Sequence, residues 1–239
     1  MIKPLLTLRL WDLPGWLWLL ASLAVLALGL MPEWLFPPQV ASAMDCPPTL
    51  GVLLAGQSAL VLLLFPFLRD RLEAGPPTGV AAACAGAILR RLMYMLSCLP
   101  LYILAAWFAD ANAADIVRSL LYLAGVSVGA WGLGRWLPDG DARKVEQHAP
   151  AIAMVLAGLL VVLGLPALLY LLSEFSDRGL AAMGLAWVAQ VSPLTNGYAV
   201  AFAGPEAGWL PQPLWAWLLW PVVGGLAAAT RLLSTRPRS

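Results

Sequence analysis

Long apolar stretches, each close to the length of a membrane-spanning helix, recur from one end of the chain to the other. About 20 apolar residues cross the hydrocarbon core of a bilayer as a helix. Lipid cannot hydrogen-bond to a bare backbone, so a spanning segment must satisfy its own backbone groups. The sequence therefore predicts an all-α integral membrane protein, with residues 1–239 forming a single transmembrane domain. Six spans are expected, at residues 13–31, 50–68, 92–108, 116–137, 149–172 and 213–233.

The composition agrees with a chain that is embedded in lipid. Hydrophobic residues make up 61% of the 239 residues and charged residues only 11%, whereas about a quarter of the residues in a soluble domain are charged. The formal net charge of +1 offers no concentrated basic face, which argues against nucleic acid as a partner. We therefore expect a multi-pass protein of the cell (inner) membrane, in contact with the lipid bilayer.

The basic residues predict the orientation of the spans. With six spans and both termini in the cytoplasm, only Arg118 and Arg178 of the 14 basic residues fall on the outer side. Loops on the cytoplasmic side carry the excess of Lys and Arg in membrane proteins, so this orientation is favoured. The remaining twelve basic residues fall on the inner side: Lys3, Arg9, Arg69, Arg71, Arg90, Arg91, Arg135, Arg143, Lys144, Arg231, Arg236 and Arg238.

A seventh apolar stretch, residues 179–203, does not fit this pattern. A full crossing there would turn the last span around and place its basic end outside. Proline removes a backbone donor, and an Asn-Gly pair favours a tight turn. We therefore expect a re-entrant helical hairpin on the outer side over residues 179–212, with a kinked helix lying flat on the surface as the alternative. Its break is predicted at Ser192, Pro193, Thr195, Asn196 and Gly197.

Two segments on the predicted inner side differ from ordinary connectors. Residues 1–12 combine Lys3 and Arg9 with leucine and tryptophan, which suits an amphipathic helix lying in the membrane interface. The loop between spans two and three, residues 69–91, opens with a cluster of charges, breaks at residues 75–77 and continues with small residues. This loop is predicted to be a short rigid element that a soluble partner contacts.

Signatures of an enzyme are missing from the sequence. It contains no GxSG motif, no GxGD motif and no GxxxxGK[ST] nucleotide-binding motif. His148 is the only histidine, and Cys46, Cys84 and Cys98 form no metal-ligand pattern. No charged residue is expected deep in a span, where proton relays usually carry one. The chain is therefore not expected to be an enzyme or to bind a metal or cofactor directly.

Small residues in span four predict close packing between helices. Gly125 and Gly129 form a GxxxG pair, and Gly132 and Gly134 follow on the same segment. This spacing lets the backbone of a neighbouring helix approach closely. Packing within one subunit is favoured over a seam between two subunits, and Gly224 and Gly225 in span six are interpreted in the same way.

The layout and two sequence stretches resemble a known family. Residues 69–75, Arg-Asp-Arg-Leu-Glu-Ala-Gly, and residues 88–91 leading into 99–104 are similar to the haem-exporter branch of the type-2 ABC permeases. These are membrane subunits of ATP-driven exporters. Pro76-Pro77 stands where Thr-Leu-Glu is common in the family. The resemblance implies a coupling helix that contacts a soluble ATP-binding subunit through Arg69, Asp70, Arg71, Glu73 and Gly75.

The same resemblance implies a division of labour between subunits. ATP and Mg²⁺ would be bound by the partner subunit, and two copies of the permease, as a homodimer or a mixed pair, would form the pathway. The expected function is outward movement of a lipid-like or amphipathic substrate. The alternative function is that of a non-transporting anchor or scaffold subunit of a larger membrane complex.

Overall fold

The computed structural model describes residues 13–30, 49–66, 89, 91–136, 149–175, 191–201 and 214–234. Every regular element in these ranges is helical, and the short segment Arg91–Ser97 precedes α8 as a further helical piece. The all-α prediction is confirmed for this part of the chain. The elements are α2 (Leu13–Leu30), α5 (Thr49–Leu64), α8 (Leu99–Phe108), α9 (Ala113–Gly134), α10 (Ala149–Leu159), the π-helical turn η2 (Leu160–Gly164), α11 (Leu165–Phe175), α13 (Pro193–Ala201) and α14 (Leu214–Ser234).

Each of the six predicted spans contains helix, but the helices differ in their capacity to cross a bilayer. Ala113–Gly134 and Ile152–Leu169 are long and apolar enough to do so. The bent pair Arg91–Ser97 and Leu99–Phe108 makes a third if it forms one span. The apolar parts of α2, α5 and α14 are shorter. Apolar helices compatible with a membrane protein are therefore present, whereas the six-span count and the orientation of the termini stay predictions.

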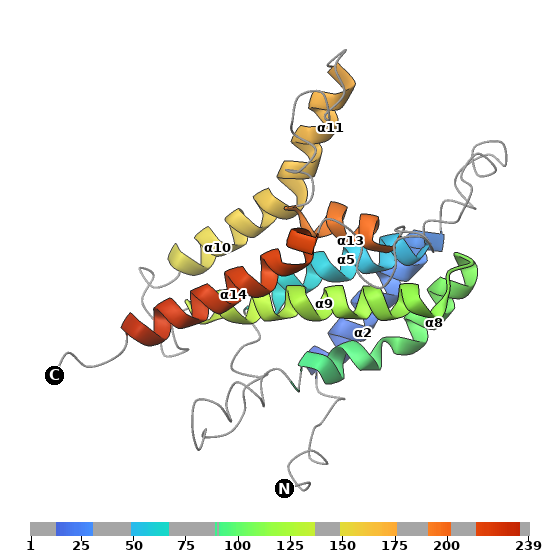
Figure 1. Ribbon diagram of the computed structural model, residues 1–239, viewed down its shortest axis with the longest axis horizontal. Helices are drawn as coiled ribbons and strands as arrows, with labels where there is room; N and C mark the ends of the chain where they lie inside the picture. The colour runs from blue at the N-terminus through green and yellow to red at the C-terminus, as the bar shows by residue number, and fades with distance from the viewer. Residues whose placement is uncertain are drawn as a thin grey trace, which may run out of the picture.

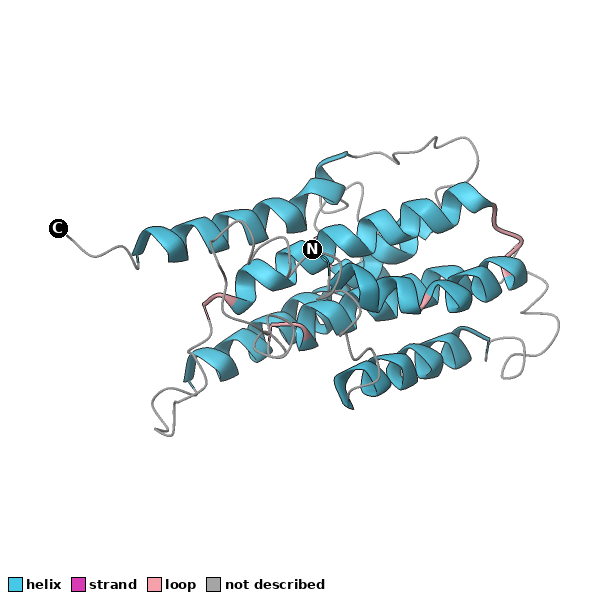
Figure 2. Ribbon diagram, turned by 90° about the horizontal axis from the view of Figure 1, so that it is seen from below, coloured by secondary structure: helices cyan, strands magenta, loops and turns pink. Residues whose placement is uncertain are grey.

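Helix α5 occupies the centre of the helix bundle (Figure 1). It contacts α2, α8, α9 and α13, and Leu53, Leu54 and Val61 on it are fully buried. A helix that is apolar on every side packs best where neighbours surround it. Helices α9 and α14 lie side by side along most of their length in both ribbon views (Figures 1 and 2).

Helices α10 and α11 present a different surface. The π-turn η2 joins them, and α11 projects away from the other helices (Figure 1). Leucines along this segment are exposed, including Leu156, Leu160 and Leu163. Contiguous exposed apolar surface of this kind is unusual on a soluble monomer, whereas it is the expected surface of a helix that contacts lipid.

A bend of 44° separates the helical piece Arg91–Ser97 from α8. Cys98 is the N-cap of α8, and Pro100 is the second residue of the helix. Proline lacks a backbone N–H and its ring collides with the carbonyl four residues earlier, here Leu96. The helix therefore restarts at Cys98 instead of continuing straight, as proline usually dictates at a sharp kink.

Glycines bring the backbones of α9 and α14 together. A Cβ atom added at Gly129 would lie 2.8 Å from the Trp220 carbonyl oxygen, and one at Gly125 would lie 3.2 Å from the Pro221 ring. Gly132 and Gly224 also face each other too closely for a side chain. The predicted role of these glycines in packing within one subunit is confirmed. Gly225 differs, because a Cβ there would meet nothing within 4 Å.

Three of the predicted segments fall largely outside the described residues. They are the interfacial helix at residues 1–12, the coupling loop up to residue 88, and the parts of the re-entrant segment at residues 179–190 and 202–212.

Candidate functional site

Polar side chains from three apolar helices meet inside the bundle. The Gln57 side-chain amide on α5 donates a hydrogen bond to the Ser22 hydroxyl on α2, at 2.8 Å. Its carbonyl oxygen accepts a hydrogen bond from the Tyr102 hydroxyl on α8, at 2.7 Å. The Cys98 thiol lies 3.5 Å from the Ser22 hydroxyl. We call Ser22, Gln57, Cys98 and Tyr102 the glutamine network, and all four are fully buried.

The glutamine network explains how α5 is fixed against its neighbours. Lipid tails are as apolar as the helices, so helix association in a membrane relies on packing and on hydrogen bonds between helices. An amide offers two donors and one acceptor group, and Gln57 uses both kinds to reach two other helices. The network therefore fixes the rotation of α2 and α8 about α5.

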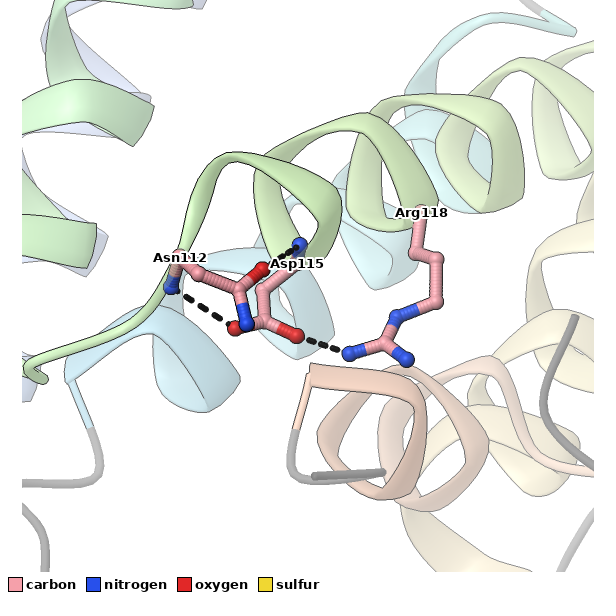
Figure 3. Close-up of polar contacts among 3 residues, drawn as sticks. All are labelled: Asn112, Asp115 and Arg118. Carbon is pink, nitrogen blue, oxygen red and sulfur yellow. Dashed lines mark hydrogen bonds and ion pairs between the residues drawn. The ribbon is translucent and has the colours of Figure 1, made fainter. Parts of the chain in front are cut away.

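A second polar group stands at the start of α9 (Figure 3). The Asn112 side chain accepts a hydrogen bond from the Asp115 backbone N–H, at 3.1 Å, and the Asp115 carboxylate accepts one from the Asn112 backbone N–H, at 2.8 Å. These reciprocal bonds form a capping box. Arg118 binds the other oxygen of the Asp115 carboxylate, and the guanidinium is buried, with 1% of the side chain exposed.

The predicted polar break at residues 192–197 coincides in part with the start of α13. Ser192 precedes the helix, and its hydroxyl accepts a hydrogen bond from the Leu194 backbone N–H, at 3.3 Å. Pro193 takes the first helical position, where its missing N–H costs nothing. The Thr195 hydroxyl donates to the Ser192 carbonyl, at 3.3 Å. The break predicted at Ser192-Pro193 is therefore a helix N-terminus.

The tight turn predicted at Asn196-Gly197 is wrong, because both residues lie inside α13. The reason is the packing of α13 against α5. A Cβ at position 197 would lie 3.1 Å from the Ala55 Cα and 3.4 Å from the Ser58 hydroxyl oxygen. Glycine is needed here so that the two backbones can approach, and Asn196 is turned into the bundle, where it is buried. Packing between helices overrides the local turn preference of the pair.

The start of α13 is attached to the π-turn in the long helical segment. The Ser192 hydroxyl donates a hydrogen bond to the Val162 carbonyl of η2, at 3.3 Å. Pro166 follows four residues after Val162, so it cannot supply the N–H that a regular α-helix would direct to that carbonyl. Single π-turns of this kind often occur at functional sites. The serine thereby satisfies a carbonyl that the proline leaves open.

Three buried hydroxyl groups lie on the two helices that pack against α13, and we call them the hydroxyl cluster: Ser58 on α5, and Ser119 and Tyr122 on α9. None of them has a hydrogen-bond partner within the described part of the chain. Ser119 and Tyr122 lie one turn apart on the same face of α9. The Asn196 side chain interacts with the Tyr122 hydroxyl outside strict hydrogen-bond geometry.

A tryptophan from α14 contacts one member of this cluster. The rings of Tyr122 and Trp217 meet edge to face, with centroids 5.9 Å apart. The Trp217 indole N–H is also buried and has no acceptor among the residues described in the structure. Four helices, α5, α9, α13 and α14, therefore contribute polar groups to one region of the interior.

The sequence-predicted site residues divide into two groups. Ser192, Pro193, Thr195, Asn196 and Gly197 lie on α13 or at its start; of these, Gly197 lies against Ser58 and Asn196 beside Tyr122. The coupling residues lie outside the described ranges, so their contacts stay predictions; they are Arg69, Asp70, Arg71, Glu73 and Gly75.

Sequence reasoning missed the buried polar groups of the helices. Gln57 interrupts an otherwise apolar run, and an amide in that position is a recognisable signal because it must find partners inside the protein. The spacing Asn112-x-x-Asp115 indicates a helix start at residue 113, three residues before the predicted span. The hydroxyls of Ser58 and Ser119 gave no such signal, since serine is common at ordinary helix contacts.

Neither a search for metal-binding side chains nor comparison with known proteins identifies a further site. In the ranges with assigned structure, no group of three or more His, Cys, Asp or Glu side chains is placed to hold a metal ion. Comparison of the chain with known protein families, with curated proteins and with solved structures gives no match.

Proposed function

We propose that the chain is the membrane-spanning permease subunit of an ATP-driven exporter of the type-2 ABC class, in the cell's inner membrane. It moves a lipid-like or amphipathic substrate outward. The energy comes from ATP hydrolysis in a separate soluble subunit, which binds the ATP and the Mg²⁺. Two permease subunits, identical or paired, form the pathway.

The observation that carries this proposal is the hydroxyl cluster. A buried hydroxyl without a partner costs about 1–3 kcal/mol, and Ser58, Ser119 and Tyr122 have no partner in the part of the chain described by the structure. A subunit that only anchors a complex has no use for such groups and is more stable with alanine and phenylalanine there. Polar groups inside a membrane bundle commonly mark the path of a substrate or ion.

The position of α13 supports a gating role. The helix packs on α5 and α9, the two helices that carry the hydroxyl cluster, and its Gly197 lies against Ser58. It is short, and the Ser192–Val162 hydrogen bond attaches its start to span five. In the predicted orientation α13 belongs to the outer segment that precedes the last span. We therefore assign it to the outer lid of the pathway, which opens to release the substrate.

The coupling step is proposed from the sequence. Arg69, Asp70, Arg71 and Glu73 form a charge cluster that ends at Gly75, and a cluster of this kind gives a soluble ATPase a specific surface to contact. Single exposed ion pairs contribute only about 0–1 kcal/mol. Reversal of all four charges together is therefore the informative change.

The experiment begins with gentle purification of the tagged chain from its own membranes, followed by assay of ATPase activity in the complex. We expect an ATPase to accompany the wild-type chain, and the fourfold charge reversal at residues 69–73 to abolish the stimulation of that ATPase. Reversal of Arg143 and Lys144 is the matched control, because these residues are also predicted to be cytoplasmic but lie on another loop. The control should retain full stimulation.

Two results would contradict the proposal. Full stimulation after the fourfold reversal would show that the charge cluster has no coupling role. Purification of a stable complex that contains no ATPase would favour the alternative function, an anchor or scaffold subunit. Neither result depends on knowing the substrate.

A further inference from the structure

We infer that the hydroxyl cluster and Trp217 form a binding site for the hydrogen-bond-accepting headgroup of an amphipathic molecule. The headgroup is an oxygen group such as a carboxylate, a phosphate ester or a carbonyl. This inference names the substrate class for the proposed exporter and therefore rests on that function, but its test needs no ATPase.

The first argument is that the polar groups of this region converge. Ser58 faces Gly197 of α13, and Tyr122 lies beside Asn196, the neighbouring residue on the same helix. Trp217 contacts the ring of Tyr122 from α14. Helices that are far apart in the sequence have thus brought Ser58, Tyr122 and Trp217 to the same part of α13, and Ser119 lies one turn before Tyr122. Such groups are almost always satisfied in folded proteins, by protein atoms, by water or by a ligand.

The second argument concerns the kind of partner that the groups need. An indole N–H can only donate a hydrogen bond, and hydroxyl groups can donate as well as accept. An oxygen acceptor is therefore a partner to which every one of them can donate, whereas a ligand that only donates leaves the Trp217 N–H unsatisfied. Arg118 lies one turn before Tyr122 on α9 and is also a pure donor, although it is engaged by Asp115.

The third argument explains why the molecule is amphipathic. Tyr122 belongs to the same cluster of buried side chains as Leu123, Val126 and Val200. These residues provide contact for a hydrocarbon chain but no further polar partner. Tyr122 and both serines have at most 2% of their surface exposed, so the site is closed in this conformation. Access requires movement of α13, which covers Ser58 with the backbone at Gly197.

The experiment measures thermal unfolding of the purified protein in phosphatidylcholine nanodiscs, with three probes that share one hydrocarbon chain. Dodecanoate carries a strong acceptor, dodecanol a weaker one, and dodecyltrimethylammonium none. A molecule that binds only the folded state raises the midpoint of unfolding as its concentration rises. We expect a shift with dodecanoate, a smaller shift with dodecanol and none with dodecyltrimethylammonium.

Variants separate binding from folding. Ser119→Ala removes a buried hydroxyl that has no hydrogen-bond partner among the described residues, and Tyr122→Phe removes one that interacts with Asn196 outside strict hydrogen-bond geometry. The protein without probe should therefore unfold at the same temperature or, for Ser119→Ala, about 2–4 °C higher. The affinity of each variant for dodecanoate should fall about 3- to 10-fold, the loss expected for one hydrogen bond. Tyr102→Phe is the matched control, because the same oxygen is lost from a hydroxyl that is bonded to Gln57. This control should unfold at a lower temperature and keep the wild-type preference among the probes.

Three results would overturn the inference. They are equal shifts with all three probes, no shift with any probe, and wild-type affinity for dodecanoate in Tyr122→Phe. Each would leave water as the partner of the hydroxyl cluster. The outcome is also independent of the coupling experiment, since a chain that binds dodecanoate selectively but recruits no ATPase would retain the site and lose only the exporter assignment.

Discussion

The Ser192 hydroxyl hydrogen-bonds to the Val162 carbonyl, and this bond joins two segments that are 30 residues apart. Ser192 also accepts the Leu194 backbone N–H, so a single hydroxyl caps α13 and attaches it to the π-turn. Pro166 has no N–H to direct at Val162 in an α-helical register, which leaves that carbonyl available to Ser192. Ser192 before α13 thus supplies a donor in place of the one that Pro166 in span five lacks.

We expect Ser192→Ala to lower the free energy of unfolding by about 1–2 kcal/mol, because it removes a helix cap and exposes an unpaired carbonyl. In a Pro166→Ala background the same change should cost clearly less, since alanine restores an N–H for Val162. The measurement is a double-mutant cycle from denaturation of the purified protein. Equal costs of Ser192→Ala in the two backgrounds would disprove the link between the residues.

The α9–α14 seam allows a test with two glycines. Gly129→Ala should destabilise the protein by about 1–3 kcal/mol, because the new Cβ collides with the Trp220 backbone carbonyl. Gly225→Ala is the control on the facing helix and has open space around it. It should be neutral or stabilising by up to about 1 kcal/mol, since alanine favours helix over glycine. The two substitutions are compared by thermal unfolding; similar costs would contradict the packing described.

The ion pair at the start of α9 should respond unequally to loss of its two members. Asp115→Ala removes both a capping carboxylate and the carboxylate that Arg118 contacts, leaving a buried cation at the positive end of a helix. Loss of one partner of a buried pair costs about 3–5 kcal/mol. Arg118→Met should cost less, because Asp115 keeps its bond to the Asn112 N–H. Denaturation curves of both variants show which one loses more free energy of unfolding. Asn112→Ala, which should cost about 1 kcal/mol, measures the loss of the cap alone.

Topology can be checked by labelling introduced cysteines with a membrane-impermeant reagent. In a variant without the three native cysteines, Asn112→Cys and Gly208→Cys should label from outside in intact cells. Gly75→Cys and Gly140→Cys should label only after the inner face is opened. Labelling of position 75 from outside would exclude the six-span arrangement with both termini in the cytoplasm.

The helical segments could be predicted from the sequence because each is one long apolar run with polar or proline boundaries. The predicted span at residues 149–172 and the observed segment Ala149–Phe175 begin at the same residue, and α14 begins and ends one residue from its prediction. The bend at Cys98 was not predicted, although Pro100 was visible. Whether a proline bends a helix or only begins one depends on how its neighbours pack.

The candidate site was harder to predict, for a different physical reason. Gln57 is 35 residues from Ser22 and 45 residues from Tyr102 along the chain. Hydrogen bonds between such distant helices leave no periodic pattern in a single sequence. The Asn196-Gly197 turn was predicted from a local preference. In the structure, Gly197 instead lets the backbone of α13 approach Ala55 of α5. This contact forms between distant segments, so a local preference cannot predict it.

The glutamine network also has a consequence for biosynthesis. Its members lie within the first 102 residues, and chains are made and folded from the N-terminus onward. The network can therefore close as soon as α8 has left the ribosome. The hydroxyl groups of Ser58, Ser119 and Tyr122 must wait for α13 and α14, nearly the last segments to emerge. The early helices α2, α5 and α8 can thus be fixed to one another before α13 and α14 pack against them.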